Sequence, residues 1–260
     1  MRPQHQKAIE KFTQYIKKDP SFVALIIGGS IAKGLEREDS DIDGIIIATD
    51  EEYKKRQRRN RFLFYEPSFC DYPGGYAEGK IINLEFLEIV AERGTEPARD
   101  AFKGAWIAYS EIPELENLLK RIPVFQKDDK IEKIRKFHAQ FEVANWYVKE
   151  AERRNDPYLL NHAISDLVLF GGRMILEHNE ILYPYHKWFM KALEEAPEKP
   201  KDLMVLVKKV LLERNSSNAQ VLYDVIKSFR TWEIRGIANV GFMLDTELAW
   251  LEGKPYIGDL

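Results

Sequence analysis

The sequence predicts an α+β protein, in which a small mixed-sheet domain is followed by an all-helical bundle domain. Short apolar runs that end at glycine or turn residues occur in the first 125 residues. From Asp128 onward these runs disappear, and apolar residues recur at helical spacing over long stretches. We therefore expect one domain at 1–125 and a second at 126–260.

The chain is expected to open with a helix over 4–18, which Asp19-Pro20 ends. Its apolar residues at helical spacing are Ala8, Ile9, Phe12, Tyr15 and Ile16. The next run, Phe22–Ile27, is continuously apolar and stops at two glycines, which is typical of a strand covered on both faces. A short helical segment then begins near Ser30, and Ile42–Ala48 is the second predicted strand.

The rest of the first domain is predicted from turn residues and caps. Gly74-Gly75 indicates a turn, and Tyr76–Ile82 follows it as the third predicted strand. Asn83 is a suitable N-cap for a helix that Gly94 ends. A short helix, a brief strand at Trp106–Tyr109 and a helix near Pro113–Arg121 complete this domain.

In the second half, one apolar stripe predicts a long helix that ends at Asp156-Pro157. The stripe consists of Ile131, Ile134, Phe137, Phe141, Ala144 and Val148. Further helices are expected over 158–178, 185–195, 201–213 and 217–251. Successive helices of this length favour a helical bundle.

Composition argues against several classes of partner. The formal net charge is −3, which gives no reason to expect a nucleic acid partner. The basic run Lys54–Arg59 is interpreted as a solvated loop or helix face. The N-terminus lacks the apolar stretch of a signal peptide, and no apolar run approaches the roughly 18 residues of a membrane span. The single cysteine, Cys70, excludes an internal disulfide, so we expect a cytoplasmic protein with no membrane partner.

The most informative segment begins at the end of the first predicted strand, at Gly28-Gly29-Ser30. Two glycines at that position let the backbone approach a bulky ligand closely. A helix that opens at Ser30 directs its free N–H groups outward, and such a terminus attracts phosphate. The Ser30 hydroxyl is a further donor. This segment therefore predicts a phosphate site.

Two acids follow at the start of the second predicted strand. Asp41 and Asp43 are two residues apart, so both carboxylates should lie on one face of the strand and Ile42 on the other. Neighbouring carboxylates repel each other unless one takes a proton or both bind a hard cation. Mg²⁺ that carries substrate phosphates fits such a pair, and phosphoryl transfer needs this combination.

Gly-Gly-Ser followed by Asp-Ile-Asp resembles the signature of the DNA polymerase β superfamily of nucleotidyltransferases. The resemblance covers roughly residues 22–90, and it implies that Gly28, Gly29 and Ser30 hold a nucleoside triphosphate while Asp41 and Asp43 hold Mg²⁺. The helical half is similar in general form to the acceptor-binding domain of aminoglycoside-type nucleotidyltransferases. One departure is Gly44, where that superfamily usually has an apolar residue. A glycine there is expected to loosen the strand without removing a ligand.

The resemblance also implies a third acid, which acts as a metal ligand or as the general base toward the acceptor hydroxyl. The candidates are Glu78, Glu85 and Glu88. We favour Glu78 because it lies in a predicted strand, whereas the other two follow the Asn83 cap on a helix. Lys33, one turn into the phosphate-binding helix, is a candidate partner for a triphosphate oxygen, with an exposed helix lysine as the alternative.

The expected activity is transfer of a nucleoside monophosphate from a triphosphate, ATP being the expected donor, to an acceptor hydroxyl with release of pyrophosphate. The acceptor would be an aminoglycoside or related small polyol, another metabolite, or a protein hydroxyl. On the helix 158–178, His162, Asp166 and Arg173 share one face and are candidate acceptor ligands, unless they form an outward polar stripe. The alternative function is a non-catalytic, nucleotide-binding or antitoxin-like interaction module.

Overall fold

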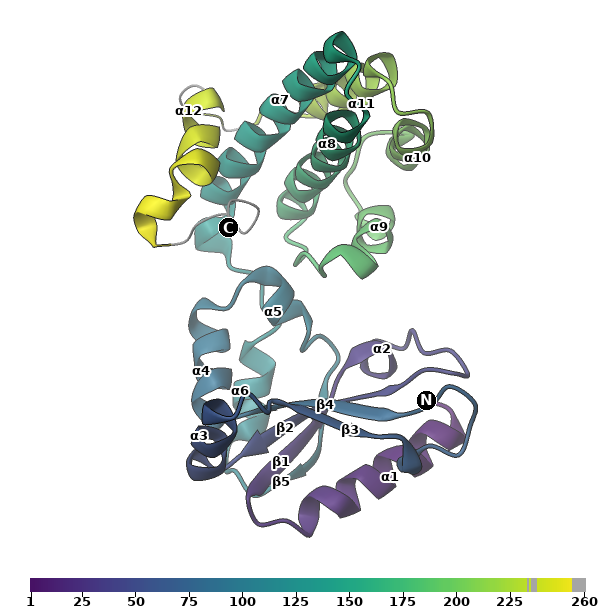
Figure 1. Ribbon diagram of the computed structural model, residues 1–260, viewed down its shortest axis with the longest axis vertical. Coiled ribbons are helices and arrows are strands. Elements are labelled where there is room, and N and C mark those ends of the chain that lie inside the picture. Colours follow the sequence, from purple (N-terminus) through teal and green to yellow (C-terminus); the bar gives the residue numbers. More distant parts are fainter. Residues whose placement is uncertain (233, 235–237, 254–260) are drawn as a thin grey trace. The chain divides into compact units, whose positions relative to one another are not determined.

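The fold is given by a computed structural model that describes residues 1–232, 234 and 238–253 (Figure 1). The chain forms two compact units, Met1–Val124 and Phe125–Leu260, here called unit 1 and unit 2. Unit 1 is built on a sheet and unit 2 consists of helices, which confirms the predicted α+β class.

The sheet of unit 1 has five strands in the order β3-β4-β2-β1-β5. In chain order they are β1 Phe22–Ile27, β2 Ile42–Ala48, β3 Leu63–Glu66, β4 Ala77–Ile82 and β5 Trp106–Ser110. Strands β2 and β4 run parallel, and the other neighbouring pairs are antiparallel. The sheet is therefore mixed, as predicted, and the first two strands have the bounds expected from their apolar runs.

Helices cover both faces of this sheet. On one face, α1 (Pro3–Lys17) buries Phe12 and Ile16 against Ile42 and Ile46 of β2. On the other face, α4 (Leu84–Arg93) and α6 (Leu115–Arg121) form a second core around Ile47. The shorter helices of unit 1 are α2 Gly29–Ala32, α3 Asp50–Arg58 and α5 Glu96–Asp100, with a 3₁₀ turn at Pro67–Phe69. Burial on both faces explains why β1 is continuously apolar.

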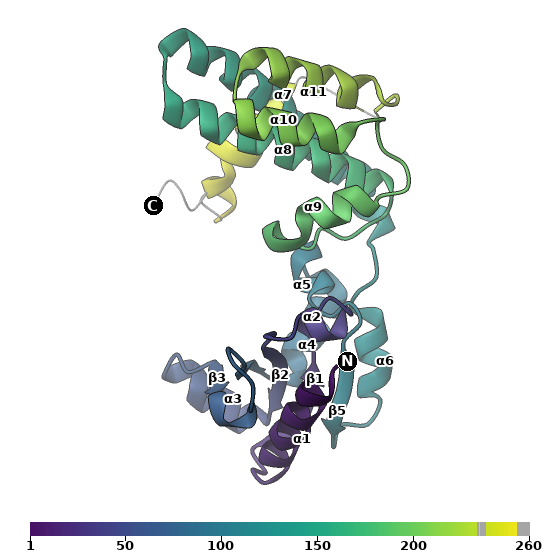
Figure 2. The ribbon, with the colours of Figure 1, turned by 90° about the vertical axis from the view of Figure 1, so that its right-hand side faces the viewer.

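Unit 2 is a helical bundle organised on two long helices, α7 (Lys130–Arg154) and α8 (Pro157–His178), which lie side by side (Figure 2). The remaining helices are α9 His186–Glu195, α10 Leu203–Glu213, α11 Ser216–Ser228 and α12 Ala238–Phe242, followed by a π-helical turn at Met243–Glu247 and a 3₁₀ turn at Ala249–Glu252. By length and composition α8 could cross a bilayer, but half of its most apolar window is buried. That burial is typical of a core helix.

Two elements differ from the predictions. Strand β3 was not expected, because its residues do not alternate between apolar and polar and it lies at the sheet edge with Leu63 and Tyr65 exposed. The single helix predicted over 217–251 is also wrong, since α11 ends at Ser228. The buried Trp232 folds back there, and its indole N–H donates to the carbonyl oxygen of Ile226 at 3.0 Å. Residues 233 and 235–237 of that predicted helix lie outside the described residues.

The basic run is part of a helix. Lys54 to Arg58 lie in α3, where no residue is buried, so the interpretation as a solvated face is confirmed. The side chain of Thr49 caps this helix by accepting a hydrogen bond from the Glu52 N–H at 3.4 Å. Cys70 is only partly buried, and its burial raises the pKa of its thiol.

Candidate functional site

One face of β2 changes from apolar to acidic along its length. Ile45 and Ile47 on this face pack into the core beneath α4 and α6. Asp43 and Asp41 precede Ile45 by two and four residues on the same face. Both side chains are half-buried and are not part of that core. Ile42 points to the other face and is fully buried in the core that α1 covers. The two aspartates therefore share a face, as the pleat predicts.

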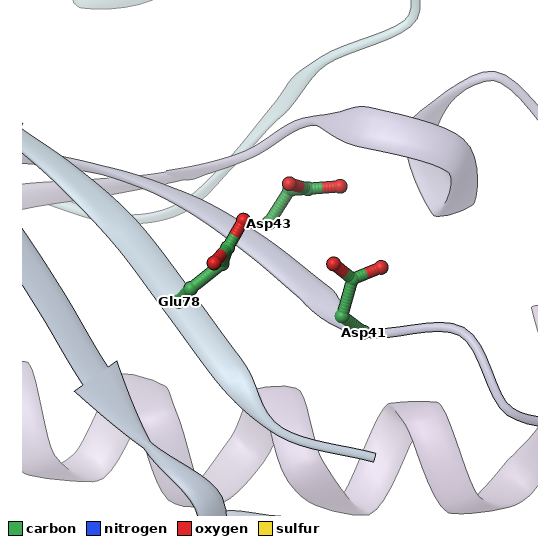
Figure 3. Close-up of side chains that lie close together, drawn as sticks. All are labelled: Asp41, Asp43 and Glu78. Atoms are coloured by element: carbon green, nitrogen blue, oxygen red, sulfur yellow. The ribbon is translucent and has the colours of Figure 1, made fainter. Parts of the chain in front are cut away.

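Glu78 joins this pair from the neighbouring strand. In the parallel register of β2 and β4, Glu78 lies beside Asp43. Figure 3 shows the side chains of Asp41, Asp43 and Glu78 directed toward one another, and their ligand oxygens lie within 4.8 Å of one another. Glu85, in contrast, lies in the first turn of α4, after Asn83, which accepts a hydrogen bond from the Phe86 N–H at 3.1 Å. The geometry therefore places Glu78 with the aspartates.

These three carboxylates fit a hard divalent cation. All of the donor atoms are oxygens, the type of ligand that Mg²⁺ prefers. Two ligands of one octahedral Mg²⁺ are separated by about 3 to 4 Å, so a cluster within 4.8 Å needs only small side-chain movements to bind one ion. A bound cation would also relieve the mutual repulsion of the acids.

Tyr76 is a member of the site that the sequence analysis missed. Its hydroxyl hydrogen-bonds to Asp41, and the charge of Asp41 is the main cause that raises the pKa of Tyr76 to about 12. The hydroxyl therefore stays protonated near neutral pH and donates to the carboxylate. The Tyr76 carbonyl oxygen accepts the Ile42 N–H at 2.9 Å, which fixes Tyr76 to the first residue of β2. Its position two residues before Glu78 was the signal that could have identified it.

The glycine turn lies directly against Asp43. The Gly28 N–H donates to the Asp43 carbonyl oxygen at 2.9 Å. Gly29 has a φ of +65°, and a Cβ atom built on it would lie 1.6 Å from a carboxylate oxygen of Asp43. The expected reason for this glycine was close approach of a ligand. The structure shows that glycine is needed here by the protein itself, because any larger residue would collide with the Asp43 side chain.

Ser30 lies in the first turn of α2, next to Gly29. Its hydroxyl oxygen is buried, and within the described part of the chain it has no hydrogen-bond partner. An unpaired hydroxyl is costly to bury, and a phosphate oxygen is a suitable partner for it. The role of Ser30 toward a triphosphate stays a prediction.

Lys33 has a protein partner that the sequence did not indicate. Its ammonium forms an ion pair with Asp100 of α5, and both side chains are largely buried. Arg99, also buried, holds α5 in place by donating to the carbonyl oxygens of Ala91 at 2.8 Å and Ile122 at 3.0 Å. Lys33 thus links α2 to a fixed helix. Its contact with a triphosphate stays a prediction. Such a contact requires the Lys33 ammonium to bind the Asp100 carboxylate and a phosphate oxygen at the same time.

Gly44 does not loosen β2. It pairs with Ile27 on one side and with Gly79 on the other, and both registers continue without a shift as far as Ile47. A Cβ atom on Gly44 would lie 2.5 Å from the ring of Phe12. The missing side chain therefore makes room for Phe12 of α1, which is fully buried.

The candidate acceptor ligands all lie on α8 in unit 2. His162 and Asp166 are brought together, with 3.4 Å between Nε2 and Oδ2. Burial raises the pKa of the Asp166 carboxyl, and the neighbouring His162 opposes this effect. The Arg173 guanidinium instead lies between the rings of Phe137 and Tyr183, 4.2 Å from each centroid. The role of these residues toward an acceptor stays a prediction.

Of three comparisons with known proteins, the one with protein families identifies the family of this chain. A family model described as a nucleotidyltransferase domain matches residues 9–152. A solved nucleotidyltransferase-like protein from Exiguobacterium sibiricum 255-15 is similar with 10% identity and a TM-score of 0.48, over 97% of this chain and 81% of that one. No curated protein matches. Because the family model covers more than half of the chain and includes the glycine turn and all three acids, the chain belongs to the nucleotidyltransferase domain family, of the DNA polymerase β type.

Proposed function

We propose that this nucleotidyltransferase uses a divalent metal ion, most suitably Mg²⁺, to transfer a nucleoside monophosphate from a triphosphate to an acceptor hydroxyl. The observation that carries the proposal is the group formed by Asp41, Asp43 and Glu78, whose ligand oxygens lie within 4.8 Å of one another. Asp43 of this group lies against Gly29, so the proposed cation site adjoins the turn that is proposed to hold the phosphates. Phosphoryl transfer depends mainly on such positioning and charge neutralisation.

Each residue has a distinct task in this proposal. Asp41 and Asp43 hold the cation, and the Tyr76 hydroxyl orients the Asp41 carboxylate by donating to it. Gly29 and Ser30 hold the triphosphate through backbone N–H groups and the Ser30 hydroxyl. The bound cation would neutralise charge on the phosphates.

Glu78 has the position of a third ligand or of the general base. As the base, it accepts the proton of the acceptor hydroxyl while the acceptor oxygen bonds to the α-phosphorus. The bond between the α-phosphorus and the bridging oxygen breaks in the same displacement, and pyrophosphate leaves. ATP is the proposed donor, and an aminoglycoside, a related small polyol or a protein hydroxyl is the proposed acceptor.

The test is the mass of the product. The protein is incubated with Mg²⁺, the four ribonucleoside triphosphates and a panel of aminoglycosides and polyols, while pyrophosphate release is followed. The mass increment of the modified acceptor identifies donor and acceptor together. The Asp43→Asn variant is the control, and it should be inactive. Normal triphosphate binding without pyrophosphate release or any mass increment would favour a non-catalytic nucleotide-binding module instead.

A further inference from the structure

Edge strand β3 exposes two large side chains beside the acids. Leu63 is 78% exposed and Tyr65 is 63% exposed. Phe64, between them, points to the other face and stacks on Phe12, with 4.9 Å between ring centroids. Exposed apolar side chains on an edge strand invite unwanted pairing, so natural sequences usually avoid them. Their presence here needs a reason.

Tyr65 lies in line with the acids across the sheet, whereas Leu63 lies opposite Lys80. Tyr65 is directly opposite Glu78 in the antiparallel register, and Glu78 lies beside Asp43. Directly opposed residues point to the same face of a sheet. Neighbouring strands are about 4.8 Å apart, so the Tyr65 backbone lies roughly 5 Å from that of Glu78 and roughly 10 Å from that of Asp43. A six-membered ring is about as wide as the distance of roughly 5 Å between the backbones of Tyr65 and Glu78.

Tyr76 connects this surface to the acids. Its ring centroid is 5.3 Å from that of Tyr65, at an interplanar angle of 40°. Its hydroxyl hydrogen-bonds to Asp41. Leu63, Tyr65 and Tyr76, here called the tyrosine platform, therefore form an apolar surface that adjoins the three carboxylates. Glu78 and Lys80, both exposed, provide polar groups along the same face.

The order of the strands decides which substrate this surface faces. The Gly29-Ser30 turn follows β1, on one side of β2, whereas Glu78 and Tyr65 lie on β4 and β3, on the other side. In an in-line displacement the leaving pyrophosphate and the attacking oxygen lie on opposite sides of the phosphorus. If the phosphates bind at the glycine turn, the acceptor hydroxyl approaches from the side of β4 and β3.

We propose that the tyrosine platform binds the acceptor, by packing against the apolar face of a hydroxylated, sugar-like ring. An aromatic side chain suits such a ring face, and the surrounding carboxylates, Lys80 and the Tyr76 hydroxyl suit its polar substituents. The inference rests on the proposed transfer reaction and adds the residues that select the acceptor. Tyr65 and Leu63 then determine acceptor affinity, whereas the cation and the triphosphate bind without them.

The platform can be tested by acceptor binding, without turnover. The probes are methyl α-D-glucopyranoside, glucosamine and kanamycin, with open-chain sorbitol for comparison. Binding to the full chain is measured by saturation-transfer NMR and calorimetry, with Mg²⁺ and a non-hydrolysable triphosphate present. We expect a ring compound to bind better than sorbitol, and Tyr65→Ala to weaken that binding about tenfold, the effect of one well-packed aromatic contact. Tyr65→Phe, which keeps the ring, should stay within about threefold of the wild type.

The controls separate this inference from the proposed function. Leu63→Ala should weaken binding of the same ring compound, whereas Leu212→Ala, at a leucine of 67% exposure on α10, should not. Unchanged ring binding in Tyr65→Ala, absence of ring binding in the wild type, or weaker triphosphate binding in Tyr65→Ala would each overturn the platform. So would a dimer that Tyr65→Ala dissociates in sedimentation. Pyrophosphate release is measured separately. Its absence would count against the proposed transfer reaction, whatever the variants show about ring binding.

Discussion

Replacement of Gly29 by alanine is a sharp test of how the site is built. The residue has a φ of +65°, where an L-residue costs roughly 1 to 2 kcal/mol more than glycine. In addition, the new Cβ atom would lie 1.6 Å from a carboxylate oxygen of Asp43 and 2.6 Å from its Cβ atom. Two non-bonded heavy atoms normally lie about 3.5 Å apart, roughly twice the distance between the new Cβ atom and the carboxylate oxygen. The Asp43 side chain or the glycine turn must therefore move by more than about 1 Å.

The cost of the backbone strain and of the steric overlap can be estimated. Overpacking of this kind costs about 1 to 3 kcal/mol, so the free energy of unfolding should fall by roughly 2 to 5 kcal/mol with the backbone strain included. A displacement of about 1 Å at a reacting centre costs on the order of 10²-fold in rate. We therefore expect Gly29→Ala to lose at least that factor in turnover and to bind Mn²⁺ more weakly.

Two other glycines provide matched controls. Gly34 has a φ of +67° but nothing within 4 Å of an added Cβ atom, so Gly34→Ala should show the strain alone. Gly28 has a φ of −121° and a ψ of −148°, and the nearest contact of an added Cβ atom would be 3.6 Å away, so Gly28→Ala should destabilise the protein less than Gly29→Ala. Urea unfolding, Mn²⁺ binding and pyrophosphate release are measured for each variant. Equal destabilisation in Gly29→Ala and Gly34→Ala, with Mn²⁺ binding intact in both, would show that contact with Asp43 is not what requires glycine at position 29.

Three further predictions concern single side chains. Glu78→Gln should lower turnover by about 10² to 10⁴ with little effect on triphosphate binding, and the same pattern in Glu85→Gln instead would contradict the assignment of the third acid. Lys33→Met leaves the buried Asp100 carboxylate without its ion-pair partner and should destabilise the protein by about 3 to 5 kcal/mol in urea unfolding. Adding Asp100→Asn should restore part of that loss, and strictly additive effects would show that the pair is not coupled. If α8 contributes to acceptor binding, Asp166→Ala should weaken acceptor affinity in calorimetry while triphosphate binding holds; unchanged acceptor affinity would exclude that role.

The parts of the fold that the sequence predicts well are those in which burial determines the residue type. Strand β1 is buried on both faces, as is the part of β2 after Gly44, and both strands have the predicted bounds, Phe22–Ile27 and Ile42–Ala48. Strand β3 has one exposed face occupied by Leu63 and Tyr65, and no alternation distinguishes it from a loop. Beyond Ser228, where α11 ends, the chain turns back and the Trp232 indole donates to the carbonyl oxygen of Ile226. Such a tertiary contact leaves no periodic signal.

In the candidate site, too, local patterns were predicted correctly and contacts between distant segments were not. The two aspartates were placed on one face by the period of a strand, a local property of the backbone. Glu78 was favoured only because the resemblance implies a third acid and this glutamate lies in a predicted strand, and its place beside Asp43 follows from the pairing of β2 with β4. The partner of Lys33 was not predicted, because Asp100 is 67 residues away and approaches only through α5. The need for glycine at position 29 was attributed to a ligand, because the sequence does not show that Asp43 packs against it. Contacts between distant segments therefore account for what the sequence analysis missed.

Asp41, Asp43 and Glu78 are proposed to form one divalent metal site. Its most direct test is the binding of Mn²⁺, measured by electron paramagnetic resonance on the wild type and on Asp43→Asn, with Glu85→Gln as the matched acidic control. We expect the wild type and Glu85→Gln to bind Mn²⁺ and Asp43→Asn to lose this binding. Equal Mn²⁺ binding in all three proteins would contradict it.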